Sequence, residues 1–476
     1  MALSAVVATP TYCVMVWSWE VADHPWHTQY LPAAYGLFVL LWSALFLQAW
    51  KRTGRALSLR WGVHDLELES RVRVQYFGRP RASPVRVDLH GNAATEVFYP
   101  VCHQVMRTAA SYAVVAVSLG FVVSSLAALV VFRGWFDARW GLTTFGVVLG
   151  GCVSGLVVML LNAVNARVAW RLTEFENHRT QASYETSLTV KRFSFQFCNS
   201  YCTLYYIAFF KALAHEREWE FLGNDFACLR DNCIEELSTH LLSLLCTQLV
   251  VANVRDVAVP AWQSRARAPP EPGQRLLAEA DSVPRYVEEA RLRRHAPIFD
   301  AYDGIVVQFG YITLFALACP LVSLLAAVNN LISMRSDSFK LCQLCQRPAL
   351  ELADGIGSWG AVLQLMVFAS VATNCGVVFF TMDAVIEWVP DVLMRVVLFF
   401  LTEHAILALG RLLESAVPRT AQDVANERAR ENYQRMIVRQ EENLGMHAVD
   451  PAAVELRRDE EWCAAEARDS APRSIM

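Results

Sequence analysis

The sequence has few charged residues for its length. Only 18% of its 476 residues are Asp, Glu, Lys or Arg, whereas a soluble domain carries about 25%. Hydrophobic residues make up 54% of the chain, and the mean hydropathy is +0.28. This composition indicates a membrane protein, and nothing in it suggests a nucleic-acid partner. The net charge of −4 does not point to any class of partner.

The sequence also lacks the common catalytic motifs. It contains no P-loop, no Gly-x-Ser-x-Gly and no His-Glu-x-x-His, and it shows no internal repeat. Cys342-Gln-Leu-Cys345 is a single Cys-x-x-Cys without the second pair that a structural zinc site needs. We therefore expect that the protein is not an enzyme, and that it has neither catalytic residues nor a zinc centre.

Most of the 13 cysteines lie in apolar runs, where they behave as small hydrophobic residues and not as a disulfide framework. Cys228 and Cys233 lie in a polar loop instead. They would form a disulfide if that loop faces an oxidising compartment, and would stay reduced otherwise. The sequence alone leaves both alternatives open.

Long apolar runs are the main feature that is present. A bilayer crossing needs about 20 apolar residues, and we predict ten crossings. Residues 2–18 have no basic flank like that of a signal peptide, so a short or truncated first span is expected there. The run that contains Pro320 is either one long tilted helix or two spans that meet near this proline. If this run is counted as two spans, 304–320 and 321–334, the remaining spans are expected at about 30–50, 108–132, 142–170, 193–213, 234–254, 358–382 and 392–412.

The predicted fold class is an all-α integral membrane protein with two long polar loops, 51–106 and 255–297. Val, Tyr and Arg alternate around residues 71–88, which indicates a strand in the first of these loops. The predicted domains are a partial first span with its loop at 1–29, a transmembrane domain at 30–412 and a charged helical tail at 413–476.

Basic residues are concentrated in three segments, 51–106, 171–192 and 255–297. In a ten-span topology these segments fall on one side of the membrane. Because cytoplasmic loops are enriched in Lys and Arg, we expect both termini to lie in the cytoplasm. The membrane is expected to be the plasma membrane or the endoplasmic reticulum.

Three neighbouring spans, at 142–170, 193–213 and 234–254, carry many hydrogen-bonding side chains. Such side chains either join helices to one another or line a water-accessible furrow. Packing alone would need fewer of them, so a furrow is predicted. The side chains expected to line it are Asn162, Gln196, Asn199, Ser200, Tyr201, Thr203, Lys211, Ser243, Thr247 and Gln248.

The last predicted span holds an ionisable pair, Glu403-His404. Ionisable residues inside a membrane span are costly and often functional. The alternative is a buried structural or subunit-interface pair, and the sequence favours this second interpretation.

Several polar and aromatic motifs follow one another along the chain. They are Leu172-Thr-Glu-Phe-Glu-Asn-His-Arg, Phe195-Gln-Phe-Cys-Asn199, Tyr206-Ile-Ala-Phe-Phe-Lys211, Gln308-Phe-Gly-Tyr, Asn329-Asn330, Asp337-x-Phe-Lys340 and Thr373-Asn374. These motifs resemble those of the anoctamin family, in family order, between residue 30 and about residue 425.

The resemblance implies a ten-span homodimer, with a furrow along spans four to six of each subunit. It also implies the activity of a calcium-activated chloride channel or a phospholipid scramblase. In such a dimer the tenth spans meet, which suits an interface role for Glu403 and His404.

The resemblance further implies a calcium site, which this sequence matches only in part. Ca²⁺ takes six to eight oxygen ligands, many of them carboxylates. Asp256 and Asp337 stand in register with acidic positions of the family. Ala301, Gly304 and Ser333 stand where the family has the other acids.

Three further side chains lie near that site but out of register. Asp300 and Asp303 keep the expected spacing one residue early, about 100° around a helix, and Asn253 lies one residue late. A remnant site would comprise Asn253, Asp256, Asp300, Asp303 and Asp337. Calcium is therefore a possible but weak ligand.

The resulting hypothesis is passive phospholipid scrambling, chloride or other anion conduction, or both, with weakened or lost calcium control. The predicted furrow spans have only Lys211 near the outer end and Lys191 and Arg192 near the inner end. Anion channels use basic residues to attract anions, so this sparse set favours scrambling. The expected partners are membrane lipids, chloride or other small ions, and a second copy of the chain.

Two alternatives remain at this stage. A non-transporting scaffold or tether would use the basic loop 255–297 and the charged tail to contact anionic lipid. A truncated and inactive product is the other, because the family's usual large amino-terminal cytoplasmic domain is missing from this sequence.

Overall fold

The protein is described by a computed structural model that divides the chain into two units. The first unit comprises residues 1–50 and 65–417, and the second comprises residues 51–64 and 418–476. The described residues are 8–13, 26–63, 72–87, 93–140, 144–213, 220–221, 224–225, 228, 232–255, 262, 292, 298–348, 355–418 and 422–443.

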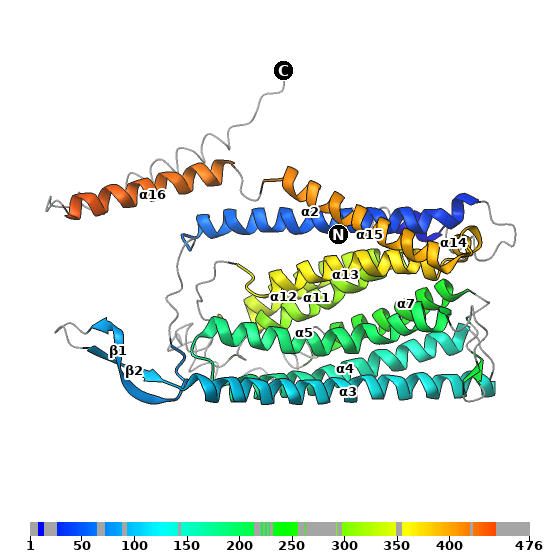
Figure 1. Cartoon of the computed structure of the whole chain (residues 1–476), viewed down its shortest axis with the longest axis horizontal. Coiled ribbons are helices and arrows are strands. Elements are labelled where there is room, and N and C mark those ends of the chain that lie inside the picture. Colours follow the sequence, from blue (N-terminus) through cyan, green and yellow to red (C-terminus); the bar gives the residue numbers. More distant parts are fainter. Residues whose placement is uncertain are drawn as a thin grey trace, which may run out of the picture. The chain divides into compact units, whose positions relative to one another are not determined.

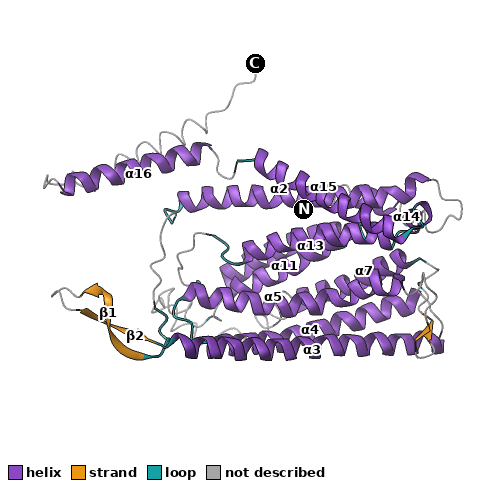
Figure 2. Ribbon diagram, in the orientation of Figure 1, coloured by secondary structure: helices purple, strands orange, loops and turns teal. Residues whose placement is uncertain are grey.

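The regular structure of the first unit is dominated by long helices (Figure 2). Helix α4 lies next to α3, α5 and α7, and α13 lies next to α11 and α15 (Figure 1). Short π-helical segments continue α5 at Tyr206–Lys211 and α12 at Lys340–Leu344. The helices are α2 (Trp26–Arg60), of which residues 51–60 belong to the second unit, α3 (Val101–Trp140), α4 (Thr144–Phe175), α5 (Gln181–Tyr205), α7 (Cys233–Asn253), α11 (Ile298–Leu314), α12 (Leu321–Phe339), α13 (Trp359–Phe380), α14 (Asp383–Trp388) and α15 (Val392–Ala416).

Five described helices are long and apolar enough to cross a membrane, and each coincides with a predicted span. They are Leu31–Arg60, Val101–Phe132, Phe145–Phe175, Trp359–Phe380 and Val392–Ala416. The expected total of ten spans is not confirmed. Helix α11 has only 17 residues, and α5 carries charged residues near its start. The short first span is also not confirmed, because only residues 8–13 of that region lie among the described residues, as a helix.

The first polar loop is shorter than predicted. Helix α2 ends at Arg60, and the turn after it contains Gly62, whose φ of 65° is left-handed. The N–H of Val63 donates to Ser58 O at 3.0 Å, and the N–H of Gly62 donates to Leu59 O at 2.9 Å, which closes the last turn. The basic residues after Trp50 indicated the membrane edge, but Lys and Arg are good helix formers and do not end the helix.

The predicted strand is confirmed within this loop. Strand β1 (Arg79–Val87) pairs antiparallel with β2 (Ala93–Phe98), with Arg79 opposite Phe98 and Arg81 opposite Glu96. Helix α3 begins three residues after β2, at Val101, so residues 101–106 are helical and not part of a loop.

The hydrophobic core of the first unit lies where α5, α11 and α13 meet. Tyr201, Tyr311 and Met366 are almost fully buried there. Gly310 permits this packing, because a side-chain carbon at that position would overlap the Tyr201 ring and the Met366 methyl group. The Tyr201 hydroxyl donates to Val307 O at 2.8 Å, which satisfies its polar atom inside the core.

Two further features answer questions that the sequence left open. A turn over residues 315–320 separates α11 from α12, so the run around Pro320 forms two helices and not one. Cys228 and Cys233 form a disulfide with a Cα–Cα separation of 5.0 Å, within the usual range for such a bond.

The second unit contains α16 (Gln422–Asn443), which lies in the predicted charged tail. Its described side chains are mostly exposed, as expected for a solvated helix. Residues 444–476 lie outside the described residues.

Candidate functional site

The turn between α4 and α5 is formed by the segment Glu176–Thr180. Asn177 has a left-handed φ of 56°, a conformation that Asn tolerates better than most residues. Its side-chain amide accepts a hydrogen bond from Phe77 N at 3.2 Å and donates one to Phe77 O at 2.9 Å. Thr180 caps α5 by accepting from Ser183 N at 3.2 Å. The turn is therefore fixed by Asn177, which bonds to Phe77, and by Thr180, which bonds to the first turn of α5.

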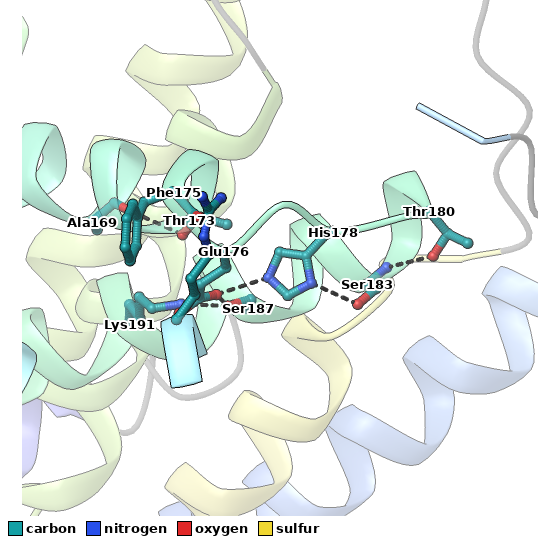
Figure 3. Close-up of polar contacts among 10 residues, drawn as sticks. Ala169, Thr173, Phe175, Glu176, His178, Thr180, Ser183, Ser187 and Lys191 are labelled. Atoms are coloured by element: carbon teal, nitrogen blue, oxygen red, sulfur yellow. Dashed lines mark hydrogen bonds and ion pairs between the residues drawn. The ribbon is translucent and has the colours of Figure 1, made fainter. Parts of the chain in front are cut away.

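A buried ionic network lies inside this turn (Figure 3). Glu176 is fully buried, and its Oε2 accepts hydrogen bonds from Lys191 Nζ at 2.7 Å and Ser187 Oγ at 2.6 Å. His178 Nε2 lies 2.8 Å from the same oxygen, and His178 Nδ1 lies 2.9 Å from Ser183 Oγ. Lys191 is also fully buried. One carboxylate thus neutralises the Lys191 ammonium and orients the His178 ring.

The pKa of Glu176 reflects these contacts. Burial alone would raise it, but hydrogen bonds with His178, Lys191, Ser111 and Ser187 together lower the pKa from 4.5 to about 2. The ionised carboxylate is therefore the stable form at neutral pH.

Arg192 and Lys211, the two other basic residues predicted near the ends of the furrow, are also paired with acidic side chains. Arg192 Nη1 lies 2.7 Å from Asp300 Oδ1, and Arg192 Nε lies 2.9 Å from Asp303 Oδ2. Lys211 Nζ donates to both carboxylate oxygens of Glu236, at 2.7 Å and 2.8 Å. Lys191, Arg192 and Lys211 therefore each contact an acidic side chain. These are the basic residues of α5 and its π-helical continuation that could have attracted anions.

Half of the ten predicted furrow residues hydrogen-bond to another element. Asn199 Nδ2 donates to Asn162 Oδ1 at 2.7 Å and to Val158 O at 2.8 Å. Gln248 Nε2 donates to the Tyr311 hydroxyl at 3.1 Å. Side-chain hydrogen bonds thus join α4 to α5 and α7 to α11.

The hydroxyl-bearing residues of this set are satisfied within their own helices or buried. Ser243 Oγ donates to His240 O at 2.9 Å, and Thr247 Oγ1 donates to Ser243 O at 2.8 Å. Ser200 and Thr203 are 1% and 7% exposed. These contacts are of the kind that ordinary helix packing also produces.

Helices α4 and α7 meet at two glycines. A side-chain carbon at Gly151 would overlap the Ser243 hydroxyl and lie 3.1 Å from His240 O. At Gly155 it would lie 3.1 Å from Thr247 Cβ. Small residues allow such close approach of two helices. The predicted furrow helices are therefore in direct contact along this seam.

The candidate calcium ligands do not gather at one point. Asn253 Nδ2 donates to Asn329 Oδ1 at 2.9 Å, whereas Asp300 and Asp303 face Arg192. The Asp337 side chain is 61% exposed and lies 3.2 Å from Lys340 Nζ. Asp256 lies outside the described residues. In the part of the chain that the structure describes, no group of three or more His, Cys, Asp or Glu is placed to hold a metal ion.

Glu403 and His404 lie on the largely exposed helix α15. The His404 side chain is 74% exposed and that of Glu403 is 18% exposed. His404 Nδ1 lies 3.6 Å from Glu403 Oε2. His404 Nδ1 lies 2.9 Å from Phe400 O of the same helix.

A family model described as "Anoctamin: Calcium-activated chloride channel" matches residues 2–431. The chain belongs to the anoctamin family. This agrees with the resemblance found in the motifs, and multi-pass membrane character follows from it.

Curated anoctamins show the same relationship at low identity. Human Anoctamin-7 is 29% identical over 368 residues, which is 73% of this chain and 39% of the relative. Human Anoctamin-5 is 29% identical over 381 residues, 74% of this chain and 41% of the relative. Human Anoctamin-10 is 28% identical over 440 residues, 87% of this chain and 59% of the relative. This anoctamin thus spans about two fifths of the length of human Anoctamin-7 and human Anoctamin-5.

The name of the matching family model implies calcium, but the described residues of this anoctamin do not fit a calcium site. Ca²⁺ needs several oxygens at 2.3–2.6 Å. Here the amide of Asn253 is bonded to another amide, Asp337 is on the surface, and Asp300 and Asp303 are bound by a guanidinium.

Sequence reasoning missed the acidic partners in this anoctamin. Glu176 lies in the motif that begins at Leu172, but no ion pair was predicted for it or for Glu236. No spacing rule would have identified them, because Glu176 and Lys191 are 15 residues apart across a turn. Glu236 and Lys211 are 25 residues apart on separate elements.

Proposed function

We propose that this anoctamin is a passive transport protein that lets phospholipid headgroups cross the membrane, with an accompanying ion leak that does not favour anions. The pathway would run along α4, α5 and α7, the three helices that carry the predicted furrow residues. The observation that carries this proposal is the pairing of Lys191, Arg192 and Lys211 with acidic partners. Paired cations attract chloride weakly, because their field is compensated.

A lipid headgroup has different requirements from a chloride ion. It is large and carries phosphate, so it needs a continuous row of hydrogen-bonding side chains more than it needs a net positive charge. Asn162, Asn199 and Gln248 supply amides of this kind on three neighbouring helices. In the conformation described, α4 and α7 are in contact at Gly151 and Gly155, so transport would require their separation.

The test is reconstitution of the full chain into liposomes that contain a headgroup-labelled lipid, with a chloride-flux assay in parallel. We expect labelled lipid to move from the inner to the outer leaflet in the presence of a calcium chelator, and ion flux to show no preference for chloride over sodium. Chloride-selective flux without lipid movement would favour the channel activity instead. If neither lipid nor ions move, the scaffold or the inactive product remains.

We further propose that calcium control is weakened or lost. Micromolar calcium is expected to leave the thermal unfolding midpoint in detergent unchanged, because a ligand stabilises a fold only when it binds the native state. The measurement compares calcium, magnesium and chelator in one buffer. A clear upward shift with calcium alone would mean that Asp256, or the pair Asp300 and Asp303, compensates for the missing acids.

We infer the remaining architecture from the family. The chain would cross the membrane ten times with both termini in the cytoplasm, and would pair with a second copy through α15. The exposed side chain of His404 is available for such a contact. The furrow of each subunit would work independently. The host membrane would be the plasma membrane or the endoplasmic reticulum.

A further inference from the structure

The acidic pair at the start of α11 faces a different neighbour from the one that its sequence position suggests. Asp300 and Asp303 lie one residue before Ala301 and Gly304, and one residue rotates a side chain by about 100° around a helix. Both carboxylates contact Arg192 of α5. They do not contact a described side chain of α7 or α12 at hydrogen-bonding distance.

Arg192 is held from several directions by the first turns of α11. Its guanidinium contacts both carboxylates and lies 5.2 Å from the centre of the Phe299 ring. The Asp303 side chain is only 5% exposed and that of Arg192 is 20% exposed. Gln196, one turn along α5, lies beside the same Asp303 carboxylate. A guanidinium with two carboxylates and an aromatic ring is an arrangement that favours Arg over Lys.

Uncharged side chains join the other helices of this region. Asn253 of α7 donates to Asn329 of α12 at 2.9 Å, and Asn329 Nδ2 donates to Gln308 Oε1 of α11 at 3.2 Å. Gln308 Nε2 donates to Ala326 O at 3.0 Å and to Asn330 Oδ1 at 3.2 Å. The side-chain amides of Asn253, Asn329 and Gln308 thus link α7, α12 and α11.

We propose that Arg192 serves as a built-in cation for Asp300 and Asp303, and that it fastens the inner end of α5 to α11 without a metal ion. The two carboxylates then form a latent divalent-cation site, with Gln196 beside it, which the guanidinium keeps covered. Removing the guanidinium leaves two close carboxylates, one of them buried, that repel each other until another cation binds. This inference concerns the α5–α11 contact and does not require that the protein transports lipid.

The experiment uses purified full-length protein in detergent and follows the thermal unfolding midpoint. In chelator, Arg192→Gln is expected to unfold several degrees below the wild type. Millimolar calcium or magnesium is expected to restore much of this loss in Arg192→Gln, while the wild type does not respond. Arg192→Lys, which keeps the charge but not the planar fork, is expected to lie between the two and to respond weakly.

The control is the triple variant Arg192→Gln, Asp300→Asn, Asp303→Asn, which removes the carboxylates together with the cation. It is expected to be more stable in chelator than Arg192→Gln and to show no divalent response. The proposal is overturned if Arg192→Gln is as stable as the wild type in chelator, or if the triple variant responds to the metals equally well.

A second pair of variants applies if Arg192→Gln does not fold. Asp303→Asn keeps the Asp300 contact and is expected to lose a smaller number of degrees. Combining it with Arg192→Lys should cost less than the sum of the two single losses, because both substitutions weaken the same interaction. Simple additivity would overturn the proposal. Since every readout is a melting temperature, failure of lipid transport and failure of this inference are distinguishable.

Discussion

Replacing Glu176 with glutamine is expected to lower the free energy of unfolding by about 3–5 kcal/mol, the usual cost of removing one partner from a buried ion pair. The variant keeps the shape of the side chain but leaves the Lys191 ammonium, which is fully buried, without its carboxylate. It also weakens the contact that orients His178. Thermal or denaturant unfolding in detergent micelles measures the effect.

The matched control is Glu185→Gln, on the exposed side of α5. Glu185 accepts a hydrogen bond from Gln181 at 2.8 Å on the surface, and surface substitutions usually change stability by no more than about 0.5 kcal/mol. A loss for Glu176→Gln no larger than that of Glu185→Gln would show that the buried network contributes little.

The same pair predicts how stability depends on pH. The folded-state pKa of Glu176 is lowered from 4.5 to about 2, so its contribution is complete above pH 4.5. This contribution is lost as the pH falls from 4.5 through 2, because over that range Glu176 binds a proton in the unfolded state and not in the folded state. The stability difference between the wild type and Glu176→Gln should therefore shrink over that range. A difference that stays constant down to pH 2 would contradict the lowered pKa.

Replacing Gly151 with valine is expected to cost about 1–3 kcal/mol, the usual effect of overpacking, and to increase lipid movement in the absence of calcium. Any side chain at this position overlaps Ser243 and comes within 3.1 Å of His240 O. The hydroxyl of Ser243 can rotate away, but the backbone oxygen cannot, so α4 and α7 must separate. Separation would expose the polar residues between them.

The control for this variant is Gly120→Val on α3. Position 120 has nothing within 4 Å of a side-chain carbon, so the substitution should leave stability and transport close to those of the wild type. Gly155→Val should have a smaller effect than Gly151→Val, because its nearest neighbour is the Thr247 side chain at 3.1 Å. Transport that does not increase in Gly151→Val, in protein that remains folded, would show that the α4–α7 seam does not limit it.

The helices could be predicted because long apolar runs have few structural alternatives in a membrane protein. The turn at Pro320 and the strand of β1 followed from equally local signals, a proline in an apolar run and an alternating pattern. The end of α2 was predicted too early. Polarity after Trp50 indicates where the bilayer ends, whereas the helix itself continues to Arg60, two residues before Gly62, where the backbone turns left-handed.

The contacts of the site could not be predicted from local patterns. Whether Asp303 faces α7 or α5 depends on how α11 is rotated about its axis, and a shift of one residue decides it. Similarly, Lys191 and Arg192 are adjacent in sequence but point to different partners, Glu176 and the acids of α11. A basic residue in a furrow span is an anion attractant only if no acidic side chain reaches it, and that depends on tertiary packing.

The Lys211–Glu236 pair has a consequence for the response to membrane voltage. An electric field does work only on charge that moves across it, about 2.3 kcal/mol per unit charge for each 100 mV. Lys211 Nζ of the π-helical segment contacts both oxygens of Glu236 on α7, so the two charges move as a neutral dipole when these two segments shift together. In such a shift the pair contributes almost no gating charge, and voltage does work on it only if the ion pair separates.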